Sequence, residues 1–324
     1  LNDTTVALSG DATDLAVALA GTINHTGAVT LTTDSNYTLS ELKTINNGTS
    51  GAITLNDTTV ALSGDATDLA AALAGTITHT GAVTVTTDSD YTASELKTIA
   101  AATSGSITLN DTTVALSGSS SDLSTIFSET ITTHTGTMTL TTDSVYTVDE
   151  LKTINNKTTG AITLNDTTVA LSGDATDLAV ALAGTINHTG AVTLTTDSNY
   201  TLSELKTINN GTSGAITLND TTVALSGDAT DLAVALAGTI NHTGAVTLTT
   251  DSNYTLSELK TINNGTSGAI TLNDTTVALS GDATDLAVAL AGTINHTGAV
   301  TLTTDSNYTL SELKTINNGT SGAI

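Results

Sequence analysis

The chain has 324 residues and a formal net charge of −25, and it contains no Cys, Pro or Trp; its seven basic residues are all Lys. This charge argues against binding to nucleic acid or to anionic membranes, and the absence of Cys excludes disulfides, thiolate metal sites and Cys nucleophiles. No run approaches the roughly 18 consecutive apolar residues of a membrane helix, so we expect no membrane insertion by this segment.

One sequence block is written six times. It begins LNDTTVALSG at Leu1 and restarts at Leu55, Leu109, Leu164, Leu218 and Leu272. The units therefore span residues 1–54, 55–108, 109–163, 164–217, 218–271 and 272–324. Neither terminal unit differs in kind from the interior units, as the capping units of a complete repeat protein would. We therefore expect a single repeat array, 1–324, that is a fragment of a longer protein.

Two segments of each unit alternate apolar and polar residues with the period of a strand. In the first unit they are residues 29–32 (VTLT) and 53–56 (ITLN). β-Branched residues dominate both segments, and this pattern predicts short, half-buried strands whose Thr side chains face outward.

A helical pattern follows each predicted strand. The segment TLSE, which starts at Thr38, is a capping box, in which the Thr hydroxyl accepts from an early helix N–H and the Glu side chain reaches back. The other helix is predicted to begin near Asp11 and to bury Leu15. Lys43 is expected toward the C-terminal end of its helix, where a cation is favourable.

Each unit thus contains two strand–turn–helix coils. One coil alone cannot bury both its strand and the apolar face of its helix, whereas stacked coils bury each other and align their strands in parallel. We predict an α/β repeat solenoid of six units, each with two coils, and a parallel sheet on one side. An all-β solenoid is the alternative, because the helical stretches are short and rich in Thr.

Two resemblances arise from these motifs. Residues 53–60 (ITLNDTTV) resemble the strand signature of leucine-rich repeats, with Thr58 in the Asn place. In the other half of the unit, the third unit fits this signature through Met138, Leu140, Asp143 and Val145. Across all 324 residues, the chain resembles giant, internally repetitive surface proteins of bacteria, especially marine cyanobacteria, in which units such as YTLSELKTINN recur. This resemblance implies an extracellular or cell-surface array and no particular biochemical activity.

Ser, His and Asp occur in every unit, so a catalytic triad has to be considered. The sequence has no G-x-S-x-G motif, and Thr159 of the third unit replaces Ser50 of the first. A catalytic site also needs an asymmetric pocket, whereas this chain repeats one surface six times. We therefore predict that the chain is not an enzyme and has no catalytic residue.

One His and one Tyr recur in each unit. The His residues are His25, His79, His134, His188, His242 and His296. Imidazoles two coils apart would be about 10 Å from each other, too far to share one metal ion. We therefore interpret each His as a loop residue that precedes a strand. The Tyr residues could stack on sugars, but packing over a helix start with the phenol at the surface is the favoured interpretation.

The acidic residues are the strongest candidates for a ligand site, because calcium prefers clustered carboxylates. Ser119 of the third unit replaces Asp11, which keeps a helix N-cap and loses a charged ligand, so we interpret Asp11 as a cap. Two other Asp residues recur in all six units. These calcium candidates are Asp3, Asp34, Asp57, Asp88, Asp111, Asp143, Asp166, Asp197, Asp220, Asp251, Asp274 and Asp305. The EF-hand and calcium β-roll motifs are absent, so apart from calcium no cofactor is expected.

These observations favour a mechanical function. Identical stacked units add reach with copy number, and negative charge keeps such arrays soluble and apart. We expect a structural segment of a secreted or surface-anchored bacterial protein, acting as a spacer or stalk of an adhesin or as part of an extracellular layer. Its partners would be neighbouring repeats and, through its open apolar ends, further copies of itself. The alternative is a multivalent binding module that holds calcium, glycan or ice on its repeated Thr/Asp face, on which Thr30 and Thr32 lie side by side.

Overall fold

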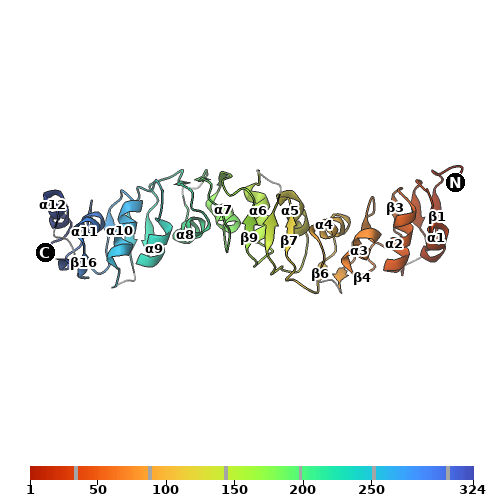
Figure 1. The fold of residues 1–324 in the computed structure, drawn as a ribbon, viewed down its shortest axis with the longest axis horizontal. Helices are drawn as coiled ribbons and strands as arrows, with labels where there is room; N and C mark the ends of the chain where they lie inside the picture. The colour runs from red at the N-terminus through yellow and green to blue at the C-terminus, as the bar shows by residue number, and fades with distance from the viewer. Residues whose placement is uncertain (33–35, 87–89, 142–144, 197–198, 250–252, 304–306) are drawn as a thin grey trace. The chain divides into compact units, whose positions relative to one another are not determined.

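The computed structural model describes residues 1–32, 36–86, 90–141, 145–196, 199–249, 253–303 and 307–324. Figure 1 shows the elements in chain order. The helices of this part are α1 (Ala12–Leu19), α2 (Leu39–Gly48), α3 (Ala66–Leu73), α4 (Ala93–Ala102), α5 (Ser120–Ser128), α6 (Val148–Asn155), α7 (Ala175–Ala181), α8 (Leu202–Gly211), α9 (Ala229–Ala235), α10 (Leu256–Gly265), α11 (Ala283–Ala289) and α12 (Leu310–Gly319). Each repeat therefore contributes two helices.

The strands are two or three residues long. They are β1 (Leu8–Gly10), β2 (Val29–Leu31), β3 (Ile53–Thr54), β4 (Leu62–Gly64), β5 (Val83–Val85), β6 (Ile107–Leu109), β7 (Leu116–Gly118), β8 (Met138–Leu140), β9 (Ile162–Leu164), β10 (Leu171–Gly173), β11 (Val192–Leu194), β12 (Ile216–Thr217), β13 (Leu225–Gly227), β14 (Val246–Leu248), β15 (Ile270–Thr271), β16 (Leu279–Gly281) and β17 (Val300–Leu302). Because every repeat contains helices as well as strands, the predicted α/β repeat solenoid is confirmed. The all-β alternative is wrong.

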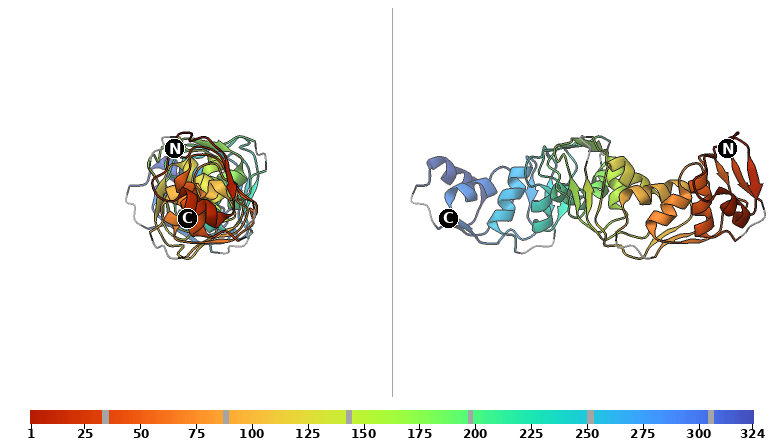
Figure 2. Two further views of the ribbon diagram at one scale, coloured as in Figure 1. Left: turned by 90° about the vertical axis from the view of Figure 1, so that its right-hand side faces the viewer. Right: turned by 45° about the vertical axis from the view of Figure 1, so that its right-hand side comes forward.

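The strands pair in parallel within small sheets. In the first repeat, β1 pairs with β2 and β2 pairs with β3, so that Leu8, Val29 and Ile53 lie in one row. The right-hand view of Figure 2 shows these short strands, in red, at the N-terminal end. The same register recurs in the later repeats. The strand at Leu8–Gly10 was not predicted, because a Leu followed by Ser and Gly is too short a segment to show alternation.

The helices begin where the sequence predicts. The Thr38 side chain accepts from the N–H of Glu41, and the Glu41 carboxylate accepts from the N–H of Thr38, so the capping box is complete. Asp11 is the N-cap of α1 and accepts from the N–H of Asp14, 2.8 Å away. In the third repeat Ser119 makes the same bond to Asp122 at 3.0 Å, which confirms that this position is a cap.

Apolar side chains of the strands and helices form the core. Val29 and Leu31 of β2 and Leu42 and Ile45 of α2 are at most 1% exposed. Burial of one such side chain contributes about 1.5–3 kcal/mol. Within the first repeats, α1 contacts α2, α2 contacts α3 and α3 contacts α4. Each coil is therefore stabilised mainly by its neighbours.

Gly27 and Gly51 lie where adjacent coils approach most closely. A Cβ atom on Gly51 would lie 2.0 Å from the carbonyl oxygen of Gly27. The same close contact recurs in the pairs Gly81 and Gly105, Gly136 and Gly160, Gly190 and Gly214, Gly244 and Gly268, and Gly298 and Gly322. Stacking of the coils thus requires a residue without a side chain at these positions.

The described chain falls into two compact units. One comprises residues 1–146 and 153–165, and the other comprises residues 147–152 and 166–324. Both are built from the same repeat, and every interaction reported below lies within one of them. In the described ranges, none of the helices has the length and apolar character needed to cross a membrane.

Candidate functional site

Six of the twelve calcium candidates lie in exposed turns. In each of these turns, one Asp oxygen accepts two hydrogen bonds from the Thr two residues later. Asp57, for example, accepts from the N–H of Thr59 at 2.8 Å and from its hydroxyl at 2.6 Å. The hydroxyl bond, followed by the backbone bond, lowers the pKa of the Asp57 carboxyl. Asp3, Asp111, Asp166, Asp220 and Asp274 make the same two bonds.

The other six candidates lie outside the described residues. They are Asp34, Asp88, Asp143, Asp197, Asp251 and Asp305. Among the residues that the structure describes, no group of three or more His, Asp or Glu side chains is placed to hold a metal ion. Calcium binding at the repeated Asp positions therefore stays a prediction.

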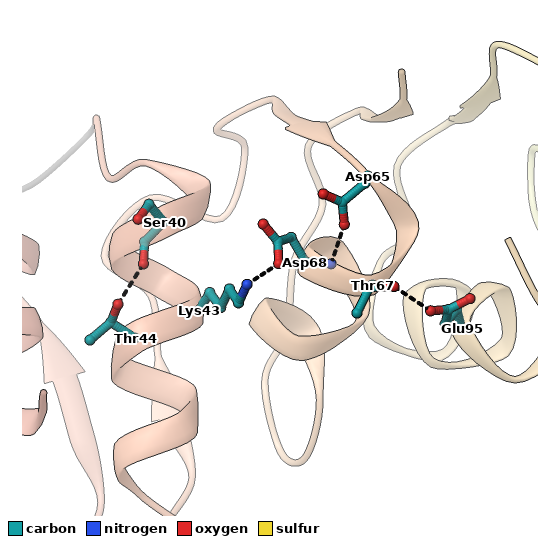
Figure 3. Close-up of polar contacts among 7 residues, drawn as sticks. All are labelled: Ser40, Lys43, Thr44, Asp65, Thr67, Asp68 and Glu95. Carbon is teal, nitrogen blue, oxygen red and sulfur yellow. Dashed lines mark hydrogen bonds and ion pairs between the residues drawn. The ribbon is translucent and has the colours of Figure 1, made fainter. Parts of the chain in front are cut away.

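Neighbouring helices are joined by ion pairs that the sequence pattern did not predict. Lys43 of α2 pairs with Asp68 of α3, and Figure 3 shows the Lys side chain extended toward that carboxylate. The equivalent pairs are Lys97 with Asp122, Lys152 with Asp177, Lys206 with Asp231 and Lys260 with Asp285. The expectation that Lys43 lies at the helix C-terminus was wrong, because α2 runs on to Gly48. Lys43 instead lies mid-helix and bonds to the next coil.

A second polar contact joins α1, α3, α7, α9 and α11 to the longer helix that follows each of them. The Thr67 hydroxyl of α3 donates to Glu95 of α4 at 2.7 Å, as Figure 3 also shows. The same bond joins Thr13 to Glu41. Glu41 thus accepts from its own helix N-cap and from the preceding helix, and these hydrogen bonds, the one from the Thr38 backbone foremost, lower its pKa.

An Asn side chain covers the C-terminal end of the next short helix. The side-chain amide of Asn46 donates to the carbonyl oxygens of Ala71 at 2.9 Å and Ala74 at 2.8 Å. Asn209 and Asn263 make equivalent contacts with α9 and α11. The last carbonyl groups of a helix have no partner within it, so this amide satisfies acceptors that would otherwise need water. The sequence reasoning missed this function of Asn46.

The recurring His side chains are buried and bonded to the neighbouring coils. His25 is 4% exposed; its Nδ1 lies 2.9 Å from the Thr49 hydroxyl and its Nε2 lies 2.8 Å from the carbonyl oxygen of Val6. His79, His188, His242 and His296 repeat both contacts. Each His therefore occupies a polar site of its own within the core. The Thr partner is retained in all six units, a signal that the sequence reasoning did not use.

The third repeat departs from this arrangement. Its His134 is fully buried, yet neither ring nitrogen has a hydrogen-bond partner. The ring instead packs edge-on against Tyr91 and Phe127, with centroids 6.5 and 6.1 Å away. Phe127 occupies the position of Leu73 in the second repeat. Burial lowers the pKa of His134, an effect that the nearby backbone of Val114 and Gly136 opposes only in part.

The Tyr side chains do not form an exposed stacking strip. Tyr37 is 2% exposed, and its hydroxyl donates to the backbone carbonyl of Asp57 at 2.9 Å. Burial, with a smaller effect of the Asp57 charge, raises the pKa of Tyr37 to about 12. Tyr91, Tyr146, Tyr200 and Tyr254 are equally buried. Each of these five lies two residues before the start of a helix, as predicted, but the prediction of a surface phenol was wrong for them. Tyr308, which is 51% exposed, differs from the other five.

The outward row of each sheet carries hydroxyl groups. Ser9 of β1 lies opposite Thr30 of β2, which lies opposite Thr54 of β3. Thr32 follows β2 and is exposed. In each three-stranded sheet the row is therefore one Ser and two Thr, and in the two-stranded sheet of β16 and β17 it is Ser280 and Thr301. Its capacity to bind glycan or ice stays a prediction.

The Asp turns, the Lys, Asn and Thr contacts between helices, and the five His–Thr sites share one property: their polar groups bond to the same turn or to a neighbouring coil of this chain. No protein-family model and no curated protein sequence matches the chain.

Proposed function

We propose that this chain is a structural repeat segment that acts as a spacer or stalk. The observation that carries the proposal is the use of its polar side chains: Lys43, Asn46 and His79 each bond to a neighbouring coil. A repeat whose polar groups hold its neighbours can be added many times, because each added copy finds the same partners. Length would then be set by the number of copies.

The cellular setting is part of the same proposal. The likeness of the whole sequence to repetitive bacterial surface proteins supports secretion or surface anchoring, in an adhesin or an extracellular layer. The formal charge of −25 supports it further, since like charges keep neighbouring arrays apart and soluble. We propose no catalytic activity for this segment.

Insertion of further repeats tests the spacer function. One and two extra copies of residues 218–271 would be inserted after Thr271 of the full chain, and small-angle X-ray scattering would measure its longest dimension. We expect equal increments of about 10 Å per copy, from two coils at a parallel-strand spacing of ~4.8 Å, with an unchanged cross-section. A Gly/Ser insertion of the same length is the control, and it should add flexible chain of about 40 Å without helix. Unequal increments, or growth like that of the control, would contradict the proposal.

A multivalent binding module is the alternative function. The observation in its favour is the repeated exposed turn, in which an Asp carboxylate accepts from a Thr hydroxyl, as Asp57 accepts from Thr59. Many weak sites at fixed spacing would add up to strong binding to a repetitive ligand. Calcium dependence of stability distinguishes this function from the spacer, because a ligand that binds only the folded state raises its stability.

We also propose that the polypeptide of residues 1–324 associates end to end. Lys314 of α12 corresponds to Lys260, and Asp14 of α1 corresponds to Asp285, which pairs with Lys260. Leu310 near Lys314 is 85% exposed, so an apolar surface lies beside the charge. Sedimentation velocity should show association that grows with concentration and that Asp14→Lys weakens. A monomer at every concentration would refute this proposal.

A further inference from the structure

The buried His sites are surrounded by hydrogen-bond acceptors. At His25, the groups within reach are the carbonyl oxygen of Val6 and the hydroxyl of Thr49. That hydroxyl also lies 3.1 Å from the carbonyl oxygen of Gly27, and its oxygen accepts the N–H of Gly51 at 3.0 Å. The same four contacts recur around His79, His242 and His296.

Counting protons shows that this site fits two states of the ring. A carbonyl oxygen can only accept, so Nε2 of His79, 2.8 Å from the Val60 oxygen, carries hydrogen in both states. The Thr103 hydroxyl has one hydrogen and two acceptors in reach, Nδ1 at 3.0 Å and the Gly81 oxygen at 3.2 Å. Beside a neutral ring, the hydroxyl donates to Nδ1. Beside a doubly protonated ring, Nδ1–H donates to the hydroxyl oxygen, and the hydroxyl donates to Gly81.

Both states keep the polar atoms of the ring bonded. A buried donor without an acceptor carries a large free-energy cost, and this site avoids that cost when the ring gains a proton. The remaining opposition is the burial of the charge itself, which lowers the pKa of His79, His242 and His296. Protonation is therefore expected below the ordinary range of His and without loss of the ring's hydrogen bonds.

The other titratable groups near a His ring do not change their protonation state in the pH range in which the ring gains its proton. For the third repeat, the facing groups are Tyr91, in ring contact with His134, and the turn residue Asp111. Burial raises the pKa of Tyr91 to about 12, so it stays neutral, and the Thr113 side chain lowers the pKa of Asp111, so it stays charged. In the second repeat the residues equivalent to Tyr91 and Asp111 are Tyr37 and Asp57, and the Tyr37 hydroxyl donates to the backbone carbonyl of Asp57.

We propose that each His–Thr pair is an internal proton acceptor of the folded array, in which the Thr hydroxyl turns from Nδ1 to the Gly carbonyl as the ring takes up its second proton. At acidic pH the His rings would thus become doubly protonated while the coils stay stacked. This inference goes beyond the spacer function, and neither depends on the other.

Nitrogen-15 NMR of the imidazoles tests the proposal on the full chain, with far-UV circular dichroism recorded on the same samples from pH 8 to pH 4. At pH 8 we expect five rings with hydrogen on Nε2 and a bare Nδ1. As the pH falls, both nitrogens should become protonated while the dichroism spectrum is unchanged. If the rings gain their second proton only as the helix signal disappears, the proposal is wrong.

Two variants at one site give a matched control. Thr266→Val removes the partner of Nδ1 in His242, so this ring should titrate about one to two pH units below the other paired rings. Thr266→Ser keeps the hydroxyl and should restore the titration. If His242 in the Thr266→Val variant titrates together with the other rings, the Thr266 hydroxyl does not accept a hydrogen bond from Nδ1–H, and the proposal is wrong.

His134 provides a natural comparison within the chain. It lacks the Thr bond, so it should titrate below the other rings or only on unfolding. Phe127→Leu restores the side chain found at the equivalent position of the second repeat and should bring His134 into the common titration. A His134 that titrates with the others in the unmodified chain would contradict the hydrogen-bond argument.

Discussion

The side-chain amide of Asn263 in α10 donates to the carbonyl oxygen of Ala291, 2.9 Å away and 28 residues later, just beyond the end of α11. One polar side chain thus covers the open end of a helix in the next coil. This bond links local helix chemistry to the stacking of the repeats.

Removal of this amide should destabilise the array. Asn263→Ala removes the side-chain donor that bonds the carbonyl oxygens of Val288, Ala289 and Ala291 at the α11 end, and we expect a loss of about 1–2 kcal/mol in the free energy of unfolding. Urea denaturation of the full chain measures it. Asn264→Ala is the control, because Asn264 is exposed and should change stability by less than about 0.5 kcal/mol. Equal effects of the two substitutions would refute the capping function.

The contact between Gly244 and Gly268 should tolerate no side chain. A Cβ atom on Gly268 would lie 1.9 Å from the Gly244 carbonyl oxygen, so Gly268→Ala must push two coils apart. We expect a loss of about 3 kcal/mol or more. Gly292→Ala is the control: its Cβ would meet no atom within 4 Å and only the positive φ of 72° opposes it, at a cost of about 1–2 kcal/mol. A milder effect at Gly268 than at Gly292 would contradict close stacking.

The ion pair of Lys260 and Asp285 should contribute little to stability. Their side chains are 37% and 36% exposed, so water and salt screen the attraction. A double-mutant cycle with Lys260→Met and Asp285→Asn should give a coupling energy below about 1 kcal/mol that decreases in high salt. A coupling of several kcal/mol, insensitive to salt, would show that this pair holds the helices together by itself.

The free energy of unfolding should fall as the pH drops below the ordinary pKa of His. Burial lowers the pKa of His79, His188, His242 and His296 in the folded chain, so below about pH 6.5 the unfolded chain binds more protons. The contribution of these His residues to stability is complete above this pH. It decreases as the pH falls toward their lowered pKa in the folded chain, and below that pKa it decreases no further. Urea midpoints measured at pH 8, 6 and 5 should fall in that order, and His242→Asn should reduce the change. Higher stability at pH 5 than at pH 8 would show that the sign is wrong.

Local patterns in the sequence predicted the local structure well. The capping box at Thr38 and the cap at Asp11 follow from side chains within three residues of the bonds they make, and the structure contains both. The alternation at Val29 likewise identified a strand, which in turn predicted parallel stacking.

Contacts between coils could not be predicted in the same way. Lys43 and Asp68 are 25 residues apart, and only the registry of the stacked coils brings them together. The same holds for Tyr37, whose phenol is buried by a turn from the next repeat. Such pairs need the coil geometry first, although positions that are constant across the six units, such as His25 and Thr49, could have indicated a paired function.

The most direct test of the spacer account is a thermal melt of the full chain by far-UV circular dichroism, once in millimolar calcium and once in chelator. If the stacked coils hold themselves together, the melting temperature will be the same in both, and the mixed helix and strand spectrum will persist in chelator. A large upward shift in calcium would contradict the account, because it would mean that the recurring Asp residues are ligands and that the array is a calcium-dependent binding module.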